Sequence, residues 1–335
     1  MGMSKESEKE IASPDQIMEL AFSFQRSRVF LTGYELGLFS ALGDGKKTSE
    51  EVAMAVGTEA RPTDRLLNAL CAMGFLEKRE GRFSNTPSTS RFLVKGKPEY
   101  MGGLMHIVHL WDSWSTLTEA VQQGKSVITK DVNERGEKWL HAFIAAMHER
   151  AHRNAPNVVS LLDLSNVYRV LDVGGGSGAY SMAFVHAREG ILTTVFDLPN
   201  VTPLTREYID QEGLSEKVET VEGDYNKDNL GSNFDLVFLS AIVHINSYDQ
   251  NKALIHKASK ALNPGGQVVI HDFIMDDDRT APAFGTLFSL NMLVGTEAGD
   301  TYTESEVRSW MGEAELSNVK RKDTEFGTTL IIGKK

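Results

Sequence analysis

Residues 169–178, Arg-Val-Leu-Asp-Val-Gly-Gly-Gly-Ser-Gly, constrain the fold of this chain more than any other stretch. An apolar run that contains Asp172 leads directly into glycines at 174, 176 and 178. This is typical of a buried strand that turns into a helix, because glycines there let a ligand approach the backbone and the N-terminus of the helix. Local turns also collect glycines, so this stretch alone does not settle whether a ligand binds.

Two further apolar runs end in acidic residues in the same way. Residues 191–196 lead into Asp197, about 20 residues after the glycines, where a carboxylate can accept both hydroxyls of a ribose. Residues 218–222 lead into Gly223 and Asp224. Because the carboxyl ends of parallel strands meet at one edge of a sheet, the pattern predicts an α/β fold with a nucleoside-binding site at that edge.

The glycine spacing fits two ligands, a nicotinamide dinucleotide and S-adenosylmethionine (SAM). Asp172 favours SAM, because its charge can organise an ammonium group, whereas a second phosphate needs helix amides without a carboxylate nearby. Asp224 can accept from an adenine amino group while Tyr225 stacks on the ring. Residues 319–322 and 328–332 resemble the closing hairpin of a class I methyltransferase sheet. Together these features favour SAM.

With these motifs the chain resembles the SAM-dependent O-methyltransferases of the plant caffeate and bacterial polyketide type, which carry an N-terminal winged-helix dimerisation domain. The motifs are Leu171–Gly178, Phe196–Pro199, Gly223–Asp224, Leu239–His244 and Asn263–Gly266. The resemblance implies a Rossmann-like class I methyltransferase sheet with an antiparallel C-terminal hairpin in residues 165–335. It also implies a cofactor site made of Asp172, Gly174, Gly176, Gly178, Asp197, Leu198, Asp224, Tyr225 and Ser240.

Residues 12–100 have the pattern of a mostly helical winged-helix domain. Thr48–Glu51 is a capping box that opens a helix ending at Gly57. A second helix is expected from Pro62 to Gly74. The resemblance implies that this domain forms a homodimer.

Two further elements are expected in the same domain. Apolar positions from Pro14 to Leu42 recur at helical spacing, and Thr32–Gly33 predicts a break into two helices. Residues 75–77 and 82–84 predict the two strands of a hairpin.

A winged helix also suggests a second function, that of a SAM-responsive DNA-binding regulator. Residues 1–100 contain 14 Lys and Arg and 14 Asp and Glu, so they lack the net positive charge that neutralises phosphates. The whole chain carries −11 at pH 7, which disfavours nucleic acid or an anionic membrane as a partner. With one cysteine, Cys71, and no long apolar run, we expect a cytoplasmic protein without a metal.

His244 is the expected general base of methyl transfer. It follows a predicted strand, residues 234–239, where the resemblance places the methyl donor. A phenol has a pKa of about 10, so an imidazole titrating near neutrality can take the proton as the oxygen attacks. Asp272 matches the acid that the family places against this imidazole, and alternation along the strand points His271 to the opposite face. From the residues alone, His244 could instead cap a helix or lie at the edge of the core.

The chain departs from the plant enzymes at three positions. Ser240 stands where they have a lysine, Ile245 where an acid usually follows the histidine, and Thr301 where a second glutamate orients the base. These differences keep open an alternative in which SAM is bound but the reaction is C-methylation or does not transfer a methyl group.

The acceptor is expected to be a small aromatic or polycyclic metabolite, and its pocket is less clearly marked. Residues 101–164 are expected to link the domains and roof the pocket. Arg150 could bind an acidic group on the acceptor or simply lie on a solvated face, and methionines at helical spacing are also typical of a core. The residues that match pocket positions are Met147, Asn291 and Met292, and His148 is included in the expected site as the neighbour of Met147.

Overall fold

The computed structural model describes residues 13–128 and 136–335. The described residues form two compact units, divided between His109 and Leu110. The boundary falls inside α6 (Leu104–Trp114), so most of the expected linker segment belongs to the second unit.

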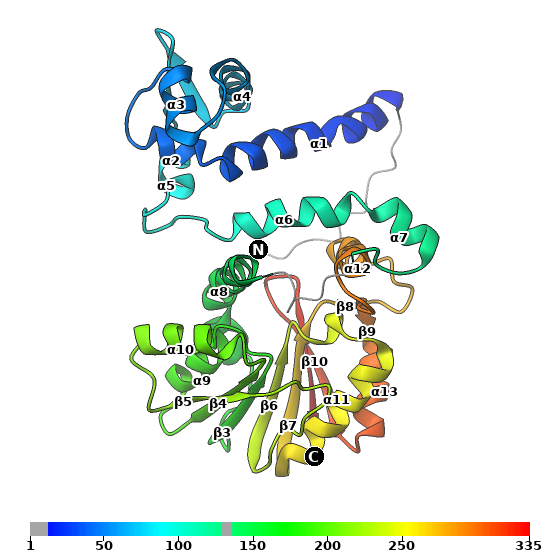
Figure 1. Ribbon diagram of the computed structural model, residues 1–335. Coiled ribbons are helices and arrows are strands. Elements are labelled where there is room, and N and C mark those ends of the chain that lie inside the picture. The colour runs from blue at the N-terminus through cyan, green and yellow to red at the C-terminus, as the bar shows by residue number, and fades with distance from the viewer. Residues whose placement is uncertain (1–12, 129–135) are drawn as a thin grey trace. The chain divides into compact units, whose positions relative to one another are not determined.

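The first unit is mostly helical and carries one hairpin (Figure 1). Thr48 and Glu51 form the predicted capping box, and the predicted hairpin pairs antiparallel between residues 76 and 85. Both sequence predictions are therefore confirmed. The elements of this unit are α1 (Pro14–Glu35), α2 (Leu38–Leu42), α3 (Ser49–Val56), α4 (Ala60–Ala72), β1 (Leu76–Arg79), β2 (Arg82–Asn85) and α5 (Pro87–Leu93).

The predicted helix break at Thr32–Gly33 is wrong. Helix α1 continues to Glu35, and the chain turns only at Gly37, whose φ of 72° is left-handed. Gly33 instead faces α4, where an added Cβ would lie 2.9 Å from Leu70 Cδ1. This glycine lets two helices pack closely, a requirement that a sequence pattern does not distinguish from a helix break.

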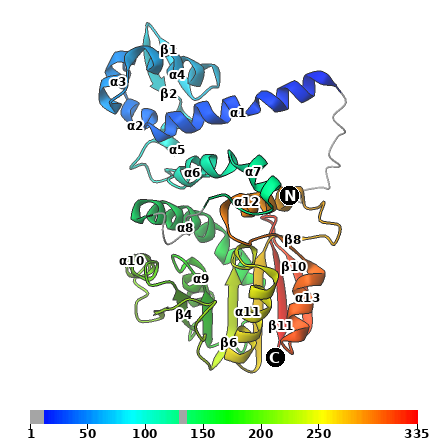
Figure 2. The ribbon, with the colours of Figure 1, turned by 45° about the vertical axis from the view of Figure 1, so that its right-hand side comes forward.

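A seven-stranded sheet forms the centre of the second unit (Figures 1 and 2). Its strand order is β10-β11-β7-β6-β3-β4-β5, with β11 antiparallel to both of its neighbours and the other pairs parallel. The predicted C-terminal hairpin is confirmed as β10–β11. The strands are β3 (Arg169–Val173), β4 (Leu192–Asp197), β5 (Val218–Glu222), β6 (Phe234–Ser240), β7 (Leu262–Asp272), β10 (Ser317–Asp323) and β11 (Thr329–Lys334).

Helices cover both faces of this sheet. Along β6, Leu236 and Phe238 pack into a core with α8 and α9, whereas Val237 and Leu239 pack into a core with α11 and α13. This period of two explains why the strands read as continuous apolar runs: both of their faces are buried. The helices are α8 (Glu137–Ser160), α9 (Ala179–Ala187), α10 (Thr202–Gln211), α11 (Tyr248–Ala261) and α13 (Glu304–Glu313).

The carboxyl ends of the parallel strands meet at one edge of the sheet. Strand β3 lies between β4 and β6, so the strand order reverses there, which is where open α/β sheets bind ligands. Helix α12 lies beyond this edge in both ribbon views. The remaining elements are α7 (Leu117–Gln123), the 3-10 helix η2 (Val243–Ile245), β8 (Ile274–Met275), α12 (Ala283–Gly295) and β9 (Tyr302–Thr303).

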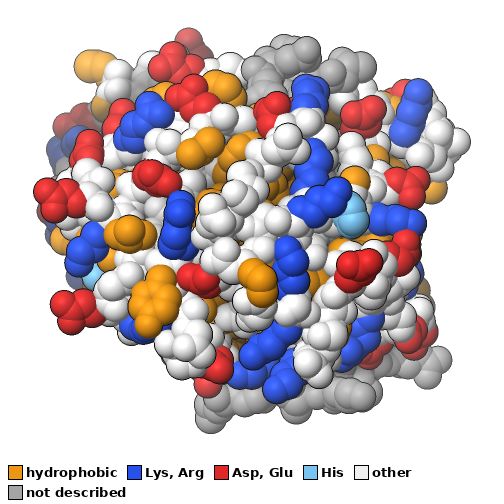
Figure 3. Space-filling view, turned by 90° about the horizontal axis from the view of Figure 1, so that it is seen from below, with side chains coloured by type: hydrophobic (Ala, Val, Ile, Leu, Met, Phe, Trp, Pro, Cys, Tyr) orange, Lys and Arg blue, Asp and Glu red, His pale blue; other side chains and the backbone are white. Residues whose placement is uncertain are grey.

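Among the described residues, no helix has the combined length and apolar character that crossing a membrane requires. The face of the molecule seen in Figure 3 shows basic and acidic side chains interspersed with apolar ones, rather than one continuous basic area.

Replacing Thr303 tests the cap of α13. Thr303 Oγ1 accepts from the Glu306 amide at 3.2 Å, and the Glu306 carboxylate accepts from the Thr303 amide at 2.8 Å. Thr303→Ala should lower the free energy of unfolding by about 1 kcal/mol and the melting temperature by about 2–4 °C, because an amide loses its partner. Thr303→Ser retains the hydroxyl and is the control; equal melting temperatures of the two variants would refute the cap.

Candidate functional site

The glycine loop between β3 and α9 has left-handed backbone at each predicted glycine. The φ angles are 64° at Gly174, 58° at Gly176 and 76° at Gly178. A Cβ on Gly174 would lie 2.3 Å from Ile242 Cδ1, whereas a Cβ on Gly176 would meet no atom nearer than 3.8 Å. The loop therefore requires glycine for its conformation at all three positions, and its backbone is accessible at Gly176.

Asp172 lies beneath this loop rather than beside an open surface. It is 1% exposed, and its Oδ2 accepts from Ser181 Oγ at 2.9 Å. Its Oδ1 is buried without a hydrogen-bond partner among the described residues. Burial, and to a smaller extent the charge of Asp197, raise the pKa of this carboxyl to about 7.

Asp197 joins the end of β4 to the glycine loop. Its Oδ2 accepts from the Gly176 amide at 2.8 Å, and its Oδ1 accepts from the Leu198 amide at 2.7 Å. Burial raises the pKa of this carboxyl, while the two amide hydrogen bonds oppose the shift. A hydroxyl of Thr205 also donates to the Gly176 carbonyl at 2.5 Å, so Gly176 is held from two sides.

Asp224 and Tyr225 follow β5 at the same edge. Asp224 accepts from the Asn226 amide and from Lys227 Nζ, both at 2.9 Å. Partial burial works to raise the pKa of Asp224, but these hydrogen bonds outweigh it and the pKa is lowered. The Tyr225 hydroxyl donates to Asn246 Oδ1 at 3.2 Å, which holds its ring near the loop that carries His244.

His244 and Asp272 form a buried pair at the ends of β6 and β7. His244 Nδ1 lies 2.7 Å from Asp272 Oδ1, with the His244 side chain 10% exposed and that of Asp272 1%. Asp272 Oδ1 also accepts from the Phe273 amide at 2.8 Å. Because a carboxylate only accepts, Nδ1 carries the proton and the Nε2 lone pair is left to act as a base.

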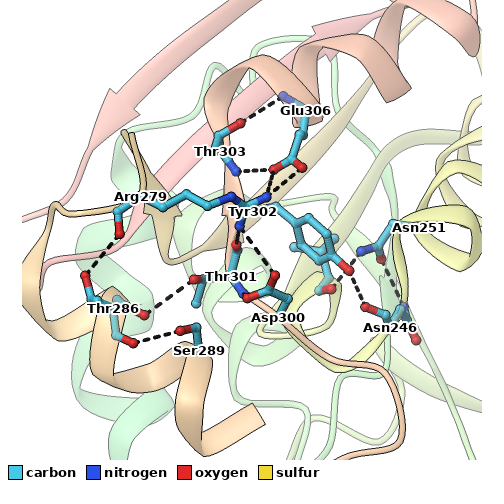
Figure 4. A network of polar contacts seen from close by, with 12 residues as sticks. Asn246, Asn251, Arg279, Thr286, Ser289, Asp300, Thr301, Tyr302, Thr303 and Glu306 are labelled. Atoms are coloured by element: carbon cyan, nitrogen blue, oxygen red, sulfur yellow. Dashed lines mark hydrogen bonds and ion pairs between the residues drawn. The ribbon is translucent and has the colours of Figure 1, made fainter. Parts of the chain in front are cut away.

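A polar network fixes the short helix η2 that carries His244 (Figure 4). The Tyr302 hydroxyl donates to the Asn246 carbonyl at 2.6 Å, and the Asn251 amide donates to the Val243 carbonyl at 2.7 Å. The backbone on both sides of His244 is thus held by side chains of β9 and α11.

Thr301, which stands where relatives of the caffeate type place an orienting glutamate, is buried and does not contact His244. Its hydroxyl donates to the Gly285 carbonyl at 3.4 Å, and its own carbonyl accepts from Arg279 at 2.7 Å. Arg279 also makes two hydrogen bonds to Glu306 at 2.7 and 2.8 Å (Figure 4). Among the described residues, Asp272 is therefore the acid that hydrogen-bonds the His244 ring.

Ser240 belongs to a second polar chain, on the other face of the sheet. Its hydroxyl lies 2.9 Å from His271 Nδ1, and His271 Nε2 lies 2.7 Å from Thr328 Oγ1. Burial lowers the pKa of His271 to about 4, so the ring is neutral at pH 7. The expected opposite orientation of His271 and Asp272 is confirmed.

The four residues expected in the acceptor pocket lie on two helices, α8 and α12. Asn291 on α12 accepts from Trp114 Nε1 at 2.8 Å, next to the buried Met292. His148 instead lies 2.9 Å from Ser177 Oγ of the glycine loop and stacks on Tyr208, with ring centroids 4.1 Å apart. Burial, helped by His152, lowers the pKa of His148. Met147 is half-buried on the same helix, α8.

Sequence reasoning missed a group of aromatic side chains beside the His244–Asp272 pair. The ring of Phe288 meets His244 edge-on at 4.9 Å and packs on Phe273 at 4.7 Å. Helix α12 is rich in apolar residues, but the contact of Phe288 with Phe273, the residue after β7, depends on the fold. No group of three or more metal-ligating side chains converges within residues 13–128 and 136–335.

Family models match both units of the chain. The O-methyltransferase domain matches residues 114–317, and the O-methyltransferase dimerisation domain matches residues 18–95.

Among curated proteins, the chain is similar to 3-hydroxy-5-methyl-1-naphthoate 3-O-methyltransferase of Streptomyces sahachiroi. The two are 35% identical over 92% of this chain and 90% of that protein. It is also 30% identical to the tetracenomycin polyketide synthesis 8-O-methyl transferase TcmO of Streptomyces glaucescens, over 97% of this chain and 98% of that one.

Two similar solved structures were determined with the cofactor or its product. Human N-acetylserotonin methyltransferase in complex with SAM superposes with a TM-score of 0.84 at 26% identity, covering 100% of this chain and 99% of that one. PigF with SAH superposes with a TM-score of 0.88 at 25% identity, covering 97% and 100%.

His271 should make the stability of the fold depend on pH. Its pKa is about 4 in the folded state and about 6.5 when unfolded, so its stabilising contribution is complete above pH 6.5 and is lost as the pH falls towards 4. The loss amounts to roughly 3 kcal/mol across this range. Urea unfolding of the wild type and of His271→Gln between pH 4 and 7.5 measures it. We expect a shallower pH dependence for the variant; parallel curves would contradict the assignment.

Proposed function

Because the chain belongs to the O-methyltransferase family and takes SAM as its cofactor, we propose that it methylates a hydroxyl of a small aromatic or polycyclic metabolite, with His244 as the general base. The printed names of two relatives refer to a hydroxynaphthoate and to tetracenomycin polyketide synthesis, which supports an aromatic acceptor. The observation that carries the proposal is the His244–Asp272 pair, 2.7 Å apart, at the sheet edge that also bears the glycine loop.

The residues at this edge fit SAM. Asp172 Oδ1 is a buried acceptor with no partner among the described side chains and backbone, which suits a cationic group placed at the loop. Bare backbone at Gly176 allows a ligand to approach, and Asp197 at the end of β4 is placed for a ribose. When bound, SAM supplies an electrophilic methyl group on a sulfonium.

We assign the remaining parts of the cofactor to residues along the same edge. Asp224 and Tyr225 bind the adenine, with the carboxylate sharing its lone pairs between Lys227 and the adenine amino group. The methionine part lies against residues 174–178, and Ser240 supplies a hydroxyl where plant relatives have a lysine. Asp172 acts through the loop from below, since its side chain is not exposed.

The proton of the acceptor hydroxyl passes to His244 Nε2 as the oxygen attacks. Asp272 holds the imidazole through Nδ1, fixes its tautomer and stabilises the imidazolium that forms. The neighbouring Phe273 and Phe288 rings limit water around the base and offer an apolar wall to a flat acceptor. The chain's contribution is therefore proton removal and alignment of the oxygen with the methyl group.

We also propose that the protein is a homodimer. The dimerisation-domain match covers residues 18–95, and α1 leaves a set of large apolar side chains exposed within its own unit. Such a helix is typical of a surface that another chain covers. The exposed residues are Ile17, Met18, Leu20, Phe22 and Phe24. A cytoplasmic location and the absence of a nucleic-acid partner stay predictions.

His244→Ala tests the base. Turnover of a phenolic acceptor such as 2-naphthol should fall by at least about 10²-fold, because the proton then has no acceptor, while SAM affinity should stay nearly unchanged. Transfer of label from methyl-labelled SAM into an ether product measures the reaction and separates it from transfer to carbon. His256→Ala, on the exposed side of α11, is the matched control. Full activity of the His244 variant would exclude it as the base.

Gly174→Ala tests the loop as the cofactor site. The added methyl group would need a left-handed backbone and would lie 2.3 Å from Ile242 Cδ1, so the loop must shift. We expect the affinity for SAH to fall about tenfold or more, measured by calorimetry. Gly190→Ala is the control. Gly190 has a φ of 87°, and no atom lies within 4 Å of an added Cβ. This variant therefore has the same strain of a left-handed backbone but should leave SAH binding intact. Equal affinities in both variants would place the cofactor elsewhere.

A further inference from the structure

Arg150 projects from α8 to the carboxyl end of β7. Its guanidinium carbon lies 5.1 Å from the centre of the Phe273 ring. Phe273 is the residue directly after Asp272. A guanidinium stacked on an aromatic face is held in position while its N–H donors stay directed outwards. Arg150 is thus a cation placed beside the acid that orients His244.

The Arg150 guanidinium has no ion pair and no side-chain hydrogen bond within the described parts of the chain. Arg153, one turn further along α8, differs in this respect because it pairs with Glu149 at 2.7 Å. Arg150 is also exposed, which leaves its donors open to a ligand.

Two buried groups near Arg150, the Tyr180 hydroxyl and the His271 ring, are neutral at pH 7. Burial raises the pKa of Tyr180 to about 12, with Ser240 and the Arg150 charge opposing the shift. Burial also holds His271 neutral, and the Arg150 charge adds to that effect. Neither of these two groups therefore neutralises the charge of Arg150.

A continuous aromatic wall joins this cation to the base. Arg150 stacks on Phe273, Phe273 packs on Phe288 at 4.7 Å, and Phe288 meets the His244 ring at 4.9 Å. The rings of Phe273 and Phe288 therefore connect the guanidinium to the His244 imidazole by successive contacts.

We propose that Arg150 binds a carboxylate on the acceptor, so that the substrate class is an aromatic hydroxy acid rather than a neutral phenol. The proposal rests on the proposed function, because it requires that the acceptor hydroxyl be placed at His244. Guanidinium and carboxylate form paired charge-assisted hydrogen bonds, which a lysine reproduces only in part.

The test compares two acceptors that differ only in the carboxylate, 3-hydroxy-1-naphthoate and 2-naphthol. The wild type should favour the acid in kcat/KM. Arg150→Gln should lower kcat/KM for the acid by about 10- to 100-fold and leave 2-naphthol nearly unchanged, because only the acid loses a charged hydrogen bond. Arg150→Lys should recover part of the loss, and Arg153→Gln, which removes the same charge from the same helix, should lose neither activity.

An equal loss for both acceptors in Arg150→Gln, or the same loss in Arg153→Gln, would overturn the inference. Calorimetry of both acceptors with SAH present separates this failure from that of the proposed function. Methylation of 2-naphthol without any preference for the acid refutes the role of Arg150 and leaves the methyltransferase reaction standing. Arg150-dependent binding of the acid without methylation supports the carboxylate site and counts against the proposed reaction. A wild type that neither binds nor methylates either acceptor counts against both.

Discussion

The alternation of side chains at the end of β7 is the constraint on which the candidate site depends. His271 and Asp272 are neighbours in the chain but face opposite sides of the sheet. Asp272 therefore reaches His244, while His271 joins Ser240 and Thr328 in a buried chain. A shift of one residue in the β6–β7 register would exchange the two side chains and leave His244 facing a neutral ring instead of a carboxylate.

The cofactor half of the site is held mainly by backbone, and this made it predictable. Left-handed φ angles at Gly174, Gly176 and Gly178 require glycine, and the amides of the loop select an acid at position 197. Such requirements fix both residue type and spacing, so the motif and the strands around it could be derived from the sequence. The burial of Asp172 could not be derived from the sequence. The spacing shows that this acid precedes the loop, but it does not show that the acid lies underneath the loop.

The acceptor half depends on contacts between distant segments, and the sequence predicted it less well. Trp114 and Asn291 are 177 positions apart, and Phe273 meets Phe288 only because α12 lies beyond the sheet edge. His148 was expected near the acceptor only because it follows Met147, and its contacts with Ser177 and Tyr208 depend on the fold. The wrong break at Gly33 has the same cause, since a glycine that permits close helix packing and one that ends a helix look alike in a sequence.

Two of the three departures from the plant pattern, Ser240 and Thr301, can be interpreted from the structure. Thr301 binds the Gly285 carbonyl, and Ser240 binds a neutral histidine, so neither brings a charge to the edge. A lysine at position 240 would have to approach His271, which burial keeps neutral. It would also lie within reach of the Arg150 charge. The cation beside the base belongs instead to α8, as Arg150 stacked on Phe273. Under the carboxylate proposal this charge recognises the acceptor, whereas the lysine of the plant enzymes would face the methyl donor.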